Sequence, residues 1–263
     1  MPETPSSAPL LLTRQGAIAT LQFNRPEALN ALDVPMAQAF LAAVQQIAAD
    51  PGVRAVRLLG AGKAFVAGGD LATLRADPVQ GAIDLIGPLN EALLLLQNLD
   101  APVIAQVHGA AAGAGLSLML MCDFVLAAEG SKFNLAYINL GTSCDVGASW
   151  ALPRLVGLRH ALEIALLGEA LGCEDALRLG LVNRVVPAAE LDAAALALAE
   201  RLASGPTRAY GQMRRLMRAS FDRELPAQLA AEAQAFDRCA RTDDLREGIE
   251  AFFARHQPNF QGR

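Results

Sequence analysis

The chain has 263 residues, of which 53% are hydrophobic and 19% are charged, and its formal net charge is −5. This length suits one large domain, or a domain with an appendage. No basic cluster is present along the sequence, which disfavours nucleic-acid binding because a row of phosphates requires Lys and Arg to neutralise it.

The cysteines and histidines are scattered and show none of the spacings of a disulfide framework or a zinc site. They are Cys122, Cys144, Cys173 and Cys239, with His108, His160 and His256. We therefore expect reduced thiols in a cytoplasmic protein, and no metal site. The first residues, MPETPSSAPLLL, carry no positive charge ahead of their short apolar run, so no signal peptide is expected.

In chain order, the first predicted element is a β-hairpin. The runs LLLTRQG and AIATLQF are short and apolar, and Gln15-Gly16 between them predicts a tight turn. Asp33 then stands where a helix N-cap is expected, and Pro51-Gly52 ends the helical pattern. The residues on its apolar face are Ala37, Phe40, Leu41, Val44 and Ile47. The next segment, VRAVRLLG, predicts a strand.

Strands and helices alternate through the middle of the chain. Residues 86–99 predict a helix, VIAQV a buried strand, residues 109–115 a small-residue turn that leads into a helix, and DFVLAAEG another strand. This repeated order indicates an α/β fold. Polar residues interrupt the apolar stretch 103–128, which predicts a core segment and no membrane span.

Two glycine-rich turns resemble nucleotide-binding motifs but lack defining residues. In GAGKAFVAGGD, Ala64 follows Lys63 where a P-loop has Ser or Thr. The second turn, GAAAGAGLS, is followed by Leu118, where a dinucleotide fingerprint that starts at Gly113 needs a glycine. Because Glu129 lies at a suitable distance, a dinucleotide-binding protein stays an alternative. The sequence contains no complete G-x-S-x-G motif, which disfavours a serine hydrolase.

The same turns place small residues where backbone N–H groups can approach a ligand closely. Ala114 lies at a predicted helix N-terminus, where the helix dipole favours negative charge. Two N–H groups that converge from two turns form an oxyanion hole. Tight packing of small residues explains the pattern equally well, so both interpretations stand at this point.

Five segments, taken in order, extend this pattern over nearly the whole chain. They are FNRPEALNAL, GAGKAFVAGGDL, APVIAQVHGAAAGAG, LSLMLMCDFVLAAE and RTDDLREGIEAFFARHQPNF. Together they resemble the enoyl-CoA hydratase/isomerase (crotonase) family. The resemblance implies a spiral of ββα repeats in residues 1–199 and a helical region in residues 200–263 that supports trimerisation and closes the coenzyme A site. It also implies a homotrimer or a dimer of trimers.

The resemblance further implies an acyl-CoA thioester substrate, with coenzyme A as part of the substrate and no tightly bound cofactor. It places the two N–H groups of the oxyanion hole at Gly69 and Ala114. It places the coenzyme A near Ala28, Ala67, Asp70 and Leu71.

The chain departs from the hydratases of this family at both of their glutamates, where it has Ser117 and Tyr137. Asp145 remains, in a stretch DVGASWALPR that is similar to isomerases of the family. Addition of water needs two positioned acid–base groups, whereas moving a C=C bond from the 3,4 to the 2,3 position needs one base. We therefore expect an isomerase in which Asp145, with its pKa raised by burial, transfers the proton and the oxyanion hole holds the dienolate.

Several alternatives remain open. A 4-chlorobenzoyl-CoA dehalogenase of the same family carries an aspartate at this position, but its histidine corresponds here to Asn90. An enoyl-CoA hydratase and a non-catalytic CoA-ester binder are the others. Asp145 is also suited to capping the helix predicted in VGASWALPRLVG. The residues predicted at the substrate pocket are Tyr137, Trp150 and Ser117.

Overall fold

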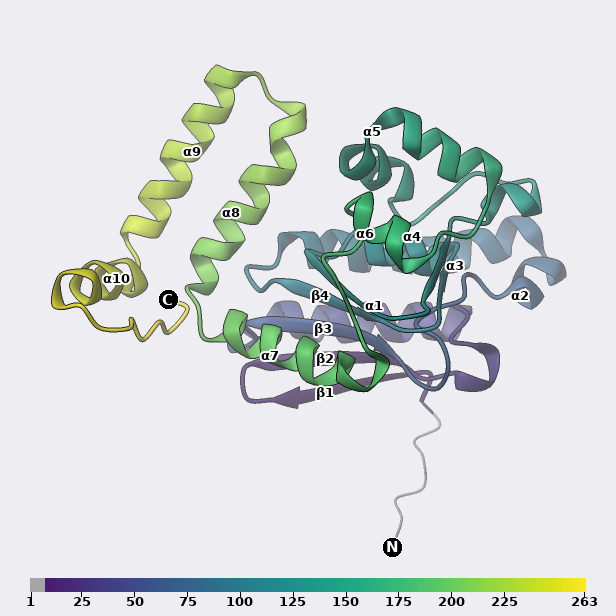
Figure 1. Cartoon of the computed structure of the whole chain (residues 1–263), viewed down its shortest axis with the longest axis horizontal. Coiled ribbons are helices and arrows are strands. Elements are labelled where there is room, and N and C mark those ends of the chain that lie inside the picture. Colours follow the sequence, from purple (N-terminus) through teal and green to yellow (C-terminus); the bar gives the residue numbers. More distant parts are fainter. Residues whose placement is uncertain (1–7) are drawn as a thin grey trace, which may run out of the picture.

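A six-stranded sheet forms the centre of the molecule, with strands in the order β1-β2-β3-β4-β6-β8 (Figure 1). The computed structural model describes residues 8–263. Most of the N-terminal stretch MPETPSSAPLLL, in which no signal peptide is expected, therefore lies outside the described residues. The strands are β1 (Leu10–Gln15), β2 (Ile18–Phe23), β3 (Ala55–Gly60), β4 (Val103–Val107), β6 (Phe124–Ala128) and β8 (Arg184–Val186). Only β1 pairs antiparallel, and the others run parallel.

The predicted hairpin and the first helix are confirmed. β1 and β2 pair from Leu10↔Phe23 to Gln15↔Ile18, and Gly16 adopts a positive φ of 58° in the turn. Asp33 begins α1 (Val34–Ala49), and its carboxylate accepts a hydrogen bond from the Met36 N–H at 2.9 Å. The turn and the helix start are thus explained by residues that are close to them in sequence.

Alternate residues of the strands point to opposite faces of the sheet, as the two-residue period of a strand requires. One face packs on α1 and α3 (Pro78–Asn98), through residues such as Leu21, Val56 and Ala105. The other face packs on α7 (Leu191–Ala203), through residues such as Ile104 and Leu126. The sheet is therefore covered on both sides, which explains its nearly continuous apolar strands.

The helix predicted at residues 86–99 is longer than expected and begins at Pro78. Asp77 is its N-cap and accepts hydrogen bonds from Val79 and Gln80 N–H at 3.0 Å. Among the helices of residues 8–263, α3 is the one that is long and apolar enough to cross a membrane, judged by length and composition alone. Its inner face packs on α1, and the core helix of a folded domain has the same composition.

The remaining elements of the core are a second small sheet and several helices. A second, two-stranded parallel sheet joins β5 (Ala110–Ala112) to β7 (Lys132–Asn134), inside a region predicted as a turn. The other helices of the core are α2 (Leu71–Ala76), α4 (Ala114–Leu120), α5 (Ala148–Leu167) and α6 (Cys173–Arg178). Short 3-10 helices cover Pro26–Ala28, Tyr137–Leu140, Ala188–Glu190 and Ser220–Asp222.

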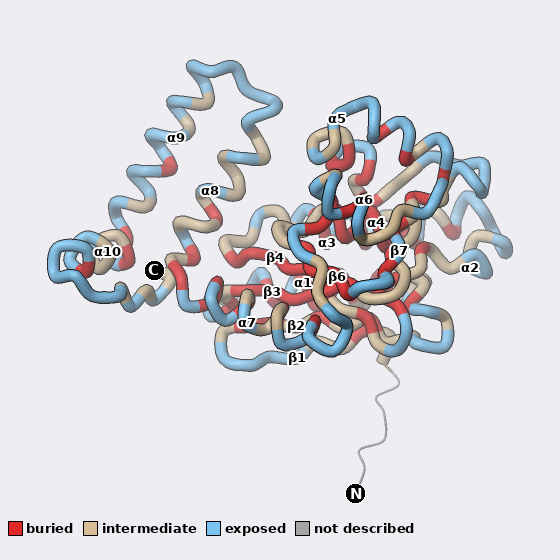
Figure 2. The backbone as a smooth tube through the Cα atoms, viewed as in Figure 1, coloured by how far each residue is buried: buried red, intermediate tan, exposed pale blue. Residues whose placement is uncertain are grey.

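A helical arm extends from one side of the sheet and is largely exposed (Figures 1 and 2). It consists of α8 (Thr207–Ala219), α9 (Leu225–Ala240) and α10 (Asp243–Ala254). Arg214 and Arg218 of α8 form ion pairs with Asp123 of the core at 2.8 and 2.7 Å, which anchors the arm. The boundary predicted between residues 199 and 200 falls inside α7, which covers the sheet.

Candidate active site

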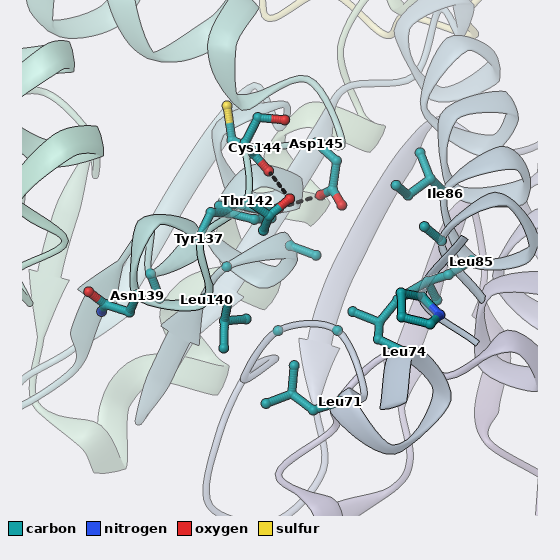
Figure 3. A pocket seen from close by; sticks show the side chains of 18 of the residues that line it. Leu71, Leu74, Leu85, Ile86, Tyr137, Asn139, Leu140, Thr142, Cys144 and Asp145 are labelled. Atoms are coloured by element: carbon teal, nitrogen blue, oxygen red, sulfur yellow. Dashed lines mark hydrogen bonds between the residues drawn. The ribbon is translucent and has the colours of Figure 1, made fainter. Parts of the chain in front are cut away.

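A cavity of about 750 Å³ opens where the two glycine-rich turns meet α2, α3 and the loop that ends at Asp145 (Figure 3). From the turns it is lined by Ala67, Gly68, Gly69, Gly113 and Ala114, and from α2 and α3 by Leu71, Leu74, Arg75, Pro78, Ala82, Leu85, Ile86 and Leu89. The loop adds Ala136, Tyr137, Asn139, Leu140, Thr142, Ser143, Cys144 and Asp145.

The two turns pack directly against each other, and their backbone conformations at Gly68 and Gly113 favour glycine. Gly68 has a φ of 119°, and Gly113 has φ 50° and ψ −122°, conformations that residues with a Cβ rarely adopt. A Cβ added at Gly113 would lie 3.6 Å from the Gly68 Cα atom. The segments that carry Gly69 and Ala114 are therefore held side by side.

Both predicted oxyanion donors line the cavity with N–H groups that are unbonded within residues 8–263. Leu32 N–H donates to Gly68 O, and Asp70 N–H donates to Leu32 O, each at 2.8 Å. Gly69 lies between these two bonds, so its own N–H points away from Leu32. Ala114 is the first residue of α4, where an N–H has no intrahelical acceptor. These two donors suit a developing negative oxygen.

One carboxylate, that of Asp145, contributes to this lining. The Tyr137 hydroxyl donates a hydrogen bond to Asp145 Oδ1, and the hydroxyls of Ser117 and Tyr137 lie 3.0 Å apart. Ser117 is fully buried on α4, behind Tyr137. Ser117 and Tyr137, which the resemblance places at the positions of the hydratase glutamates, thus form one chain of hydroxyls that ends on the Asp145 carboxylate.

Burial raises the pKa of Asp145 above the ordinary value of an aspartate, against the lowering effect of the Tyr137 hydrogen bond. Burial and the nearby Asp145 carboxylate also raise the pKa of Tyr137, so this phenol stays protonated. A carboxylate with a raised pKa accepts and returns a proton more readily near neutral pH than an exposed aspartate.

The capping interpretation of Asp145 is wrong. Helix α5 begins at Ala148, its N-cap is Gly147, and no side chain bonds to its first N–H groups. The Asp145 side chain accepts its one side-chain hydrogen bond in the described structure from Tyr137. Its carboxylate therefore belongs to the cavity and not to the helix end.

Trp150 and Ser117 do not line the cavity, contrary to the prediction. Trp150 is 37% exposed, and its ring lies under the Arg154 guanidinium, 4.2 Å from it. The start of α5 after Gly147 turns Trp150 outward. Ser117 reaches the site only through Tyr137, which does line the cavity as predicted.

The four predicted coenzyme A contacts divide into two pairs. Ala67 and Leu71 line the cavity. Ala28 lies in a 3-10 helix outside the lining, and Asp70 caps α2 by accepting from the Ala72 N–H at 2.9 Å. Contact of these residues with coenzyme A stays a prediction.

The opposite wall comes from α2 and α3, and apart from Leu71 the sequence assigned none of its residues to the site. Leu85, Ile86 and Leu89 face the cavity from α3, as the helical spacing of one, three and four residues allows. Asn90, the position of the dehalogenase histidine, is exposed outside this wall. Within residues 8–263 no group of three His, Cys, Asp or Glu side chains is arranged to hold a metal ion.

Within residues 8–263 the cavity combines apolar walls with one carboxylate and two unbonded backbone N–H groups, an arrangement that can stabilise a negative oxygen on a bound molecule. The model of the family described as enoyl-CoA hydratase/isomerase matches residues 13–263. The chain belongs to this family of acyl-CoA enzymes. This result sets aside the dinucleotide-binding alternative.

Known relatives carry the names of both reactions. The chain is 37% identical to the 1,2-epoxyphenylacetyl-CoA isomerase of Escherichia coli, covering 94% of this chain and 95% of that protein. It is 34% identical to the 2,3-dehydroadipyl-CoA hydratase of the same organism, covering 97% and 99%. A crystal structure of an enoyl-CoA hydratase from Bacillus anthracis matches with a TM-score of 0.92 and 29% identity, covering 97% of this chain and all of that chain, 100%. The predicted crotonase fold is confirmed.

Proposed function

We propose that the protein is an enoyl-CoA isomerase that moves a C=C bond from the 3,4 to the 2,3 position of an acyl-CoA thioester. One observation carries this proposal: Asp145 is the only carboxylate that the described residues bring to the cavity lining, and it stands with the N–H groups of Gly69 and Ala114. One base and an oxyanion hole are the parts that this reaction needs.

The proposed reaction moves one proton and one double bond. The Asp145 carboxylate takes a proton from C2, and the electron pair of that C–H bond becomes part of a dienolate. Its negative charge lies on the thioester oxygen, where the N–H groups of Gly69 and Ala114 donate to it. Protonated Asp145 then returns the proton to C4, which leaves the double bond between C2 and C3. One such backbone donor contributes about 3–4 kcal/mol to the stability of the transition state.

Hydration is the less favoured alternative because its second acid–base group is missing. The hydroxyls of Ser117 and Tyr137 stand at the positions of the two hydratase glutamates, and Tyr137 has its pKa raised further. A protonated phenol of this kind does not activate water. The dehalogenase alternative lacks its histidine, because that position is Asn90, which is exposed and does not line the cavity.

The test is Asp145→Asn, assayed with a 3-enoyl-CoA by the ultraviolet absorbance of the conjugated 2-enoyl product. Loss of the base is expected to lower kcat by several orders of magnitude while the CoA thioester still binds. Unchanged turnover contradicts the proposed role of Asp145. Binding without turnover by the unmodified protein supports the non-catalytic alternative.

A second candidate reaction has specific support. The relative at 37% identity is named for isomerising 1,2-epoxyphenylacetyl-CoA, and the leucine-rich cavity suits an aryl group as well as an aliphatic chain. The same assay series should therefore include an epoxide of a phenylacetyl-CoA ester. Formation of a rearranged product from that ester alone would favour this reaction over the enoyl shift.

We also propose a cytoplasmic homotrimer or dimer of trimers. The supporting features are the four free cysteines and the exposed apolar side chains of the helical arm, such as Phe236, Phe252 and Phe253. Exposed aromatic side chains of this size mark surfaces that bind another protein. Light scattering of the purified full chain tests the assembly, and a monomer would contradict it.

A further inference from the structure

Three hydroxyl and carboxyl groups form an unbroken chain beside the cavity. Ser117 Oγ lies 3.0 Å from the Tyr137 hydroxyl, and that hydroxyl donates to Asp145 Oδ1. Figure 3 shows Tyr137 and Asp145 together on one side of the cavity, facing Ile86 of α3.

The direction of the hydrogen atoms follows from what each group can donate. An ionised carboxylate only accepts hydrogen bonds, and a hydroxyl has a single hydrogen to donate. The single hydrogen of the Tyr137 hydroxyl therefore goes to Asp145 Oδ1. The hydrogen of Ser117 has two acceptors within reach, Gly113 O at 3.2 Å and the Tyr137 oxygen at 3.0 Å.

The two oxygens of Asp145 are consequently inequivalent. Oδ1 is occupied by Tyr137, whereas Oδ2 accepts no bond from any other side chain of residues 8–263. The cavity beyond it is bounded by the apolar side chains of α3, including Leu85 and Ile86. Proton transfer to and from a substrate carbon therefore falls to Oδ2.

Resting on the proposed function, we propose that Tyr137 is the positioning residue of this site. It holds Asp145 by Oδ1, directs Oδ2 toward the substrate, and keeps the carboxylate ionised in an apolar cavity, while the Ser117 hydroxyl lies against the Tyr137 oxygen. Tyr137 itself transfers no proton to the substrate.

The surroundings leave Tyr137 as the group that controls the ionisation of Asp145. The other titratable side chains of the lining are Arg75 of α2 and Cys144 of the loop, and α3 contributes apolar residues only. Neither Arg75 nor Cys144 forms a hydrogen bond or ion pair with Asp145. A hydrogen bond that favours the charged form lowers the pKa of an acid, so its removal raises the pKa of Asp145.

The first test is Tyr137→Phe, with Tyr210→Phe as the matched control, because these are the two tyrosines of the chain. Asp145 must be ionised to act as a base. In Tyr137→Phe the rising limb of the pH–rate profile is expected to move to higher pH by about one unit. Ser117→Ala should move the limb in the same direction by less, and Tyr210→Phe should leave it in place.

A second measurement does not depend on turnover. The carboxyl carbon of Asp145 is followed by NMR in protein labelled with ¹³C-aspartate, and its signal is assigned by its loss in Asp145→Asn. The pKa measured in this way is expected to rise in Tyr137→Phe. If the pKa rises but no acyl-CoA is isomerised, the proposed function fails and the role of Tyr137 stands. If isomerisation occurs and neither the limb nor the pKa moves, the role of Tyr137 is refuted.

A third variant tests the same role of Tyr137 if Tyr137→Phe fails to fold. In a Tyr210→Phe background, Tyr137 is the one remaining tyrosine, and 3-fluorotyrosine can replace it alone. Fluorination makes the phenol more acidic and strengthens its donated hydrogen bond. The limb should then move to lower pH, opposite to Tyr137→Phe. A limb that stays in place, or moves to higher pH, overturns the proposal.

Discussion

Neighbouring peptide groups of the second glycine turn have opposite tasks, and this difference can be tested by exchanging single amides for esters. The Gly113 N–H donates to Asn134 O at 2.8 Å, whereas the Ala114 N–H is unbonded among residues 8–263 and faces the cavity. Lactic acid at position 114, or glycolic acid at position 113, removes one N–H group and keeps the shape of the backbone.

The expected effects of the two esters are opposite. Without the Ala114 N–H, one of two donors to the thioester oxygen is lost, which corresponds to about 3 kcal/mol and a fall in kcat of about 100- to 1000-fold. The ester at position 114 should have a small effect on stability, because the Ala114 N–H has no partner among residues 8–263 to lose. Without the Gly113 N–H, a structural hydrogen bond worth about 1 kcal/mol disappears, and kcat should change only a few-fold.

The assay combines turnover of a 3-enoyl-CoA with urea unfolding of both esters and of the unmodified protein. Each ester also weakens the carbonyl group that precedes it, so the comparison between the two positions matters more than either value. If the ester at position 114 retains full kcat, or destabilises the fold as much as the ester at position 113, the oxyanion hole is not where we place it.

Three further predictions concern stability and substrate size. Because burial raises the pKa of Asp145, the native protein binds more protons than the unfolded chain between the ordinary aspartate value of 3.8 and the raised one, and stability falls as pH rises through this window. Asp145→Asn lacks that fall, so at pH 7 its free energy of unfolding should exceed that of the unmodified protein, and at pH 3 the difference should vanish. Gly115→Ala places a Cβ 2.1 Å from Val66 O and should cost about 1–3 kcal/mol in urea unfolding; a loss below the error of the measurement would contradict the tight packing of α4. Ile86→Phe, opposite Asp145 in Figure 3, should raise KM for long or aryl acyl groups more than for a four-carbon one, and an equal effect on all would exclude Ile86 from the acyl wall.

Local signals allowed the first elements of the fold to be predicted. The turn at Gly16 and the cap at Asp33 depend on residues next to them in sequence, and both are found as expected. The start of α3 was missed although Asp77 and Pro78 form a typical N-terminus. Glycines and a proline inside the helix, at positions 81, 87 and 88, masked the pattern that those two residues begin.

The parts of the site that lie in sequence motifs could be predicted. The parts that are formed only by the packing of helices could not. Gly69, Ala114 and Asp145 lie in segments that resemble the family, and they meet in one cavity. The wall from α3 has no such motif, because Leu85 and Ile86 differ from other core leucines and isoleucines only in what they face. The error at Trp150 has the same origin: the start of α5 sets which way the ring turns.

The two N–H groups that we propose as donors to the thioester oxygen belong to the main chain, at Gly69 and Ala114, and this has a consequence for how such a protein evolves. Amino-acid replacement at these two positions changes a side chain but leaves the N–H group in place, proline excepted. The proposed stabilisation of the thioester oxygen therefore survives most single substitutions at these two positions. The proposed base, Asp145, and the residues that we propose to position it, Tyr137 and Ser117, act through their side chains, so mutation can replace them. One scaffold can thus exchange its acid–base groups, and with them its reaction, while its means of polarising a thioester is inherited intact.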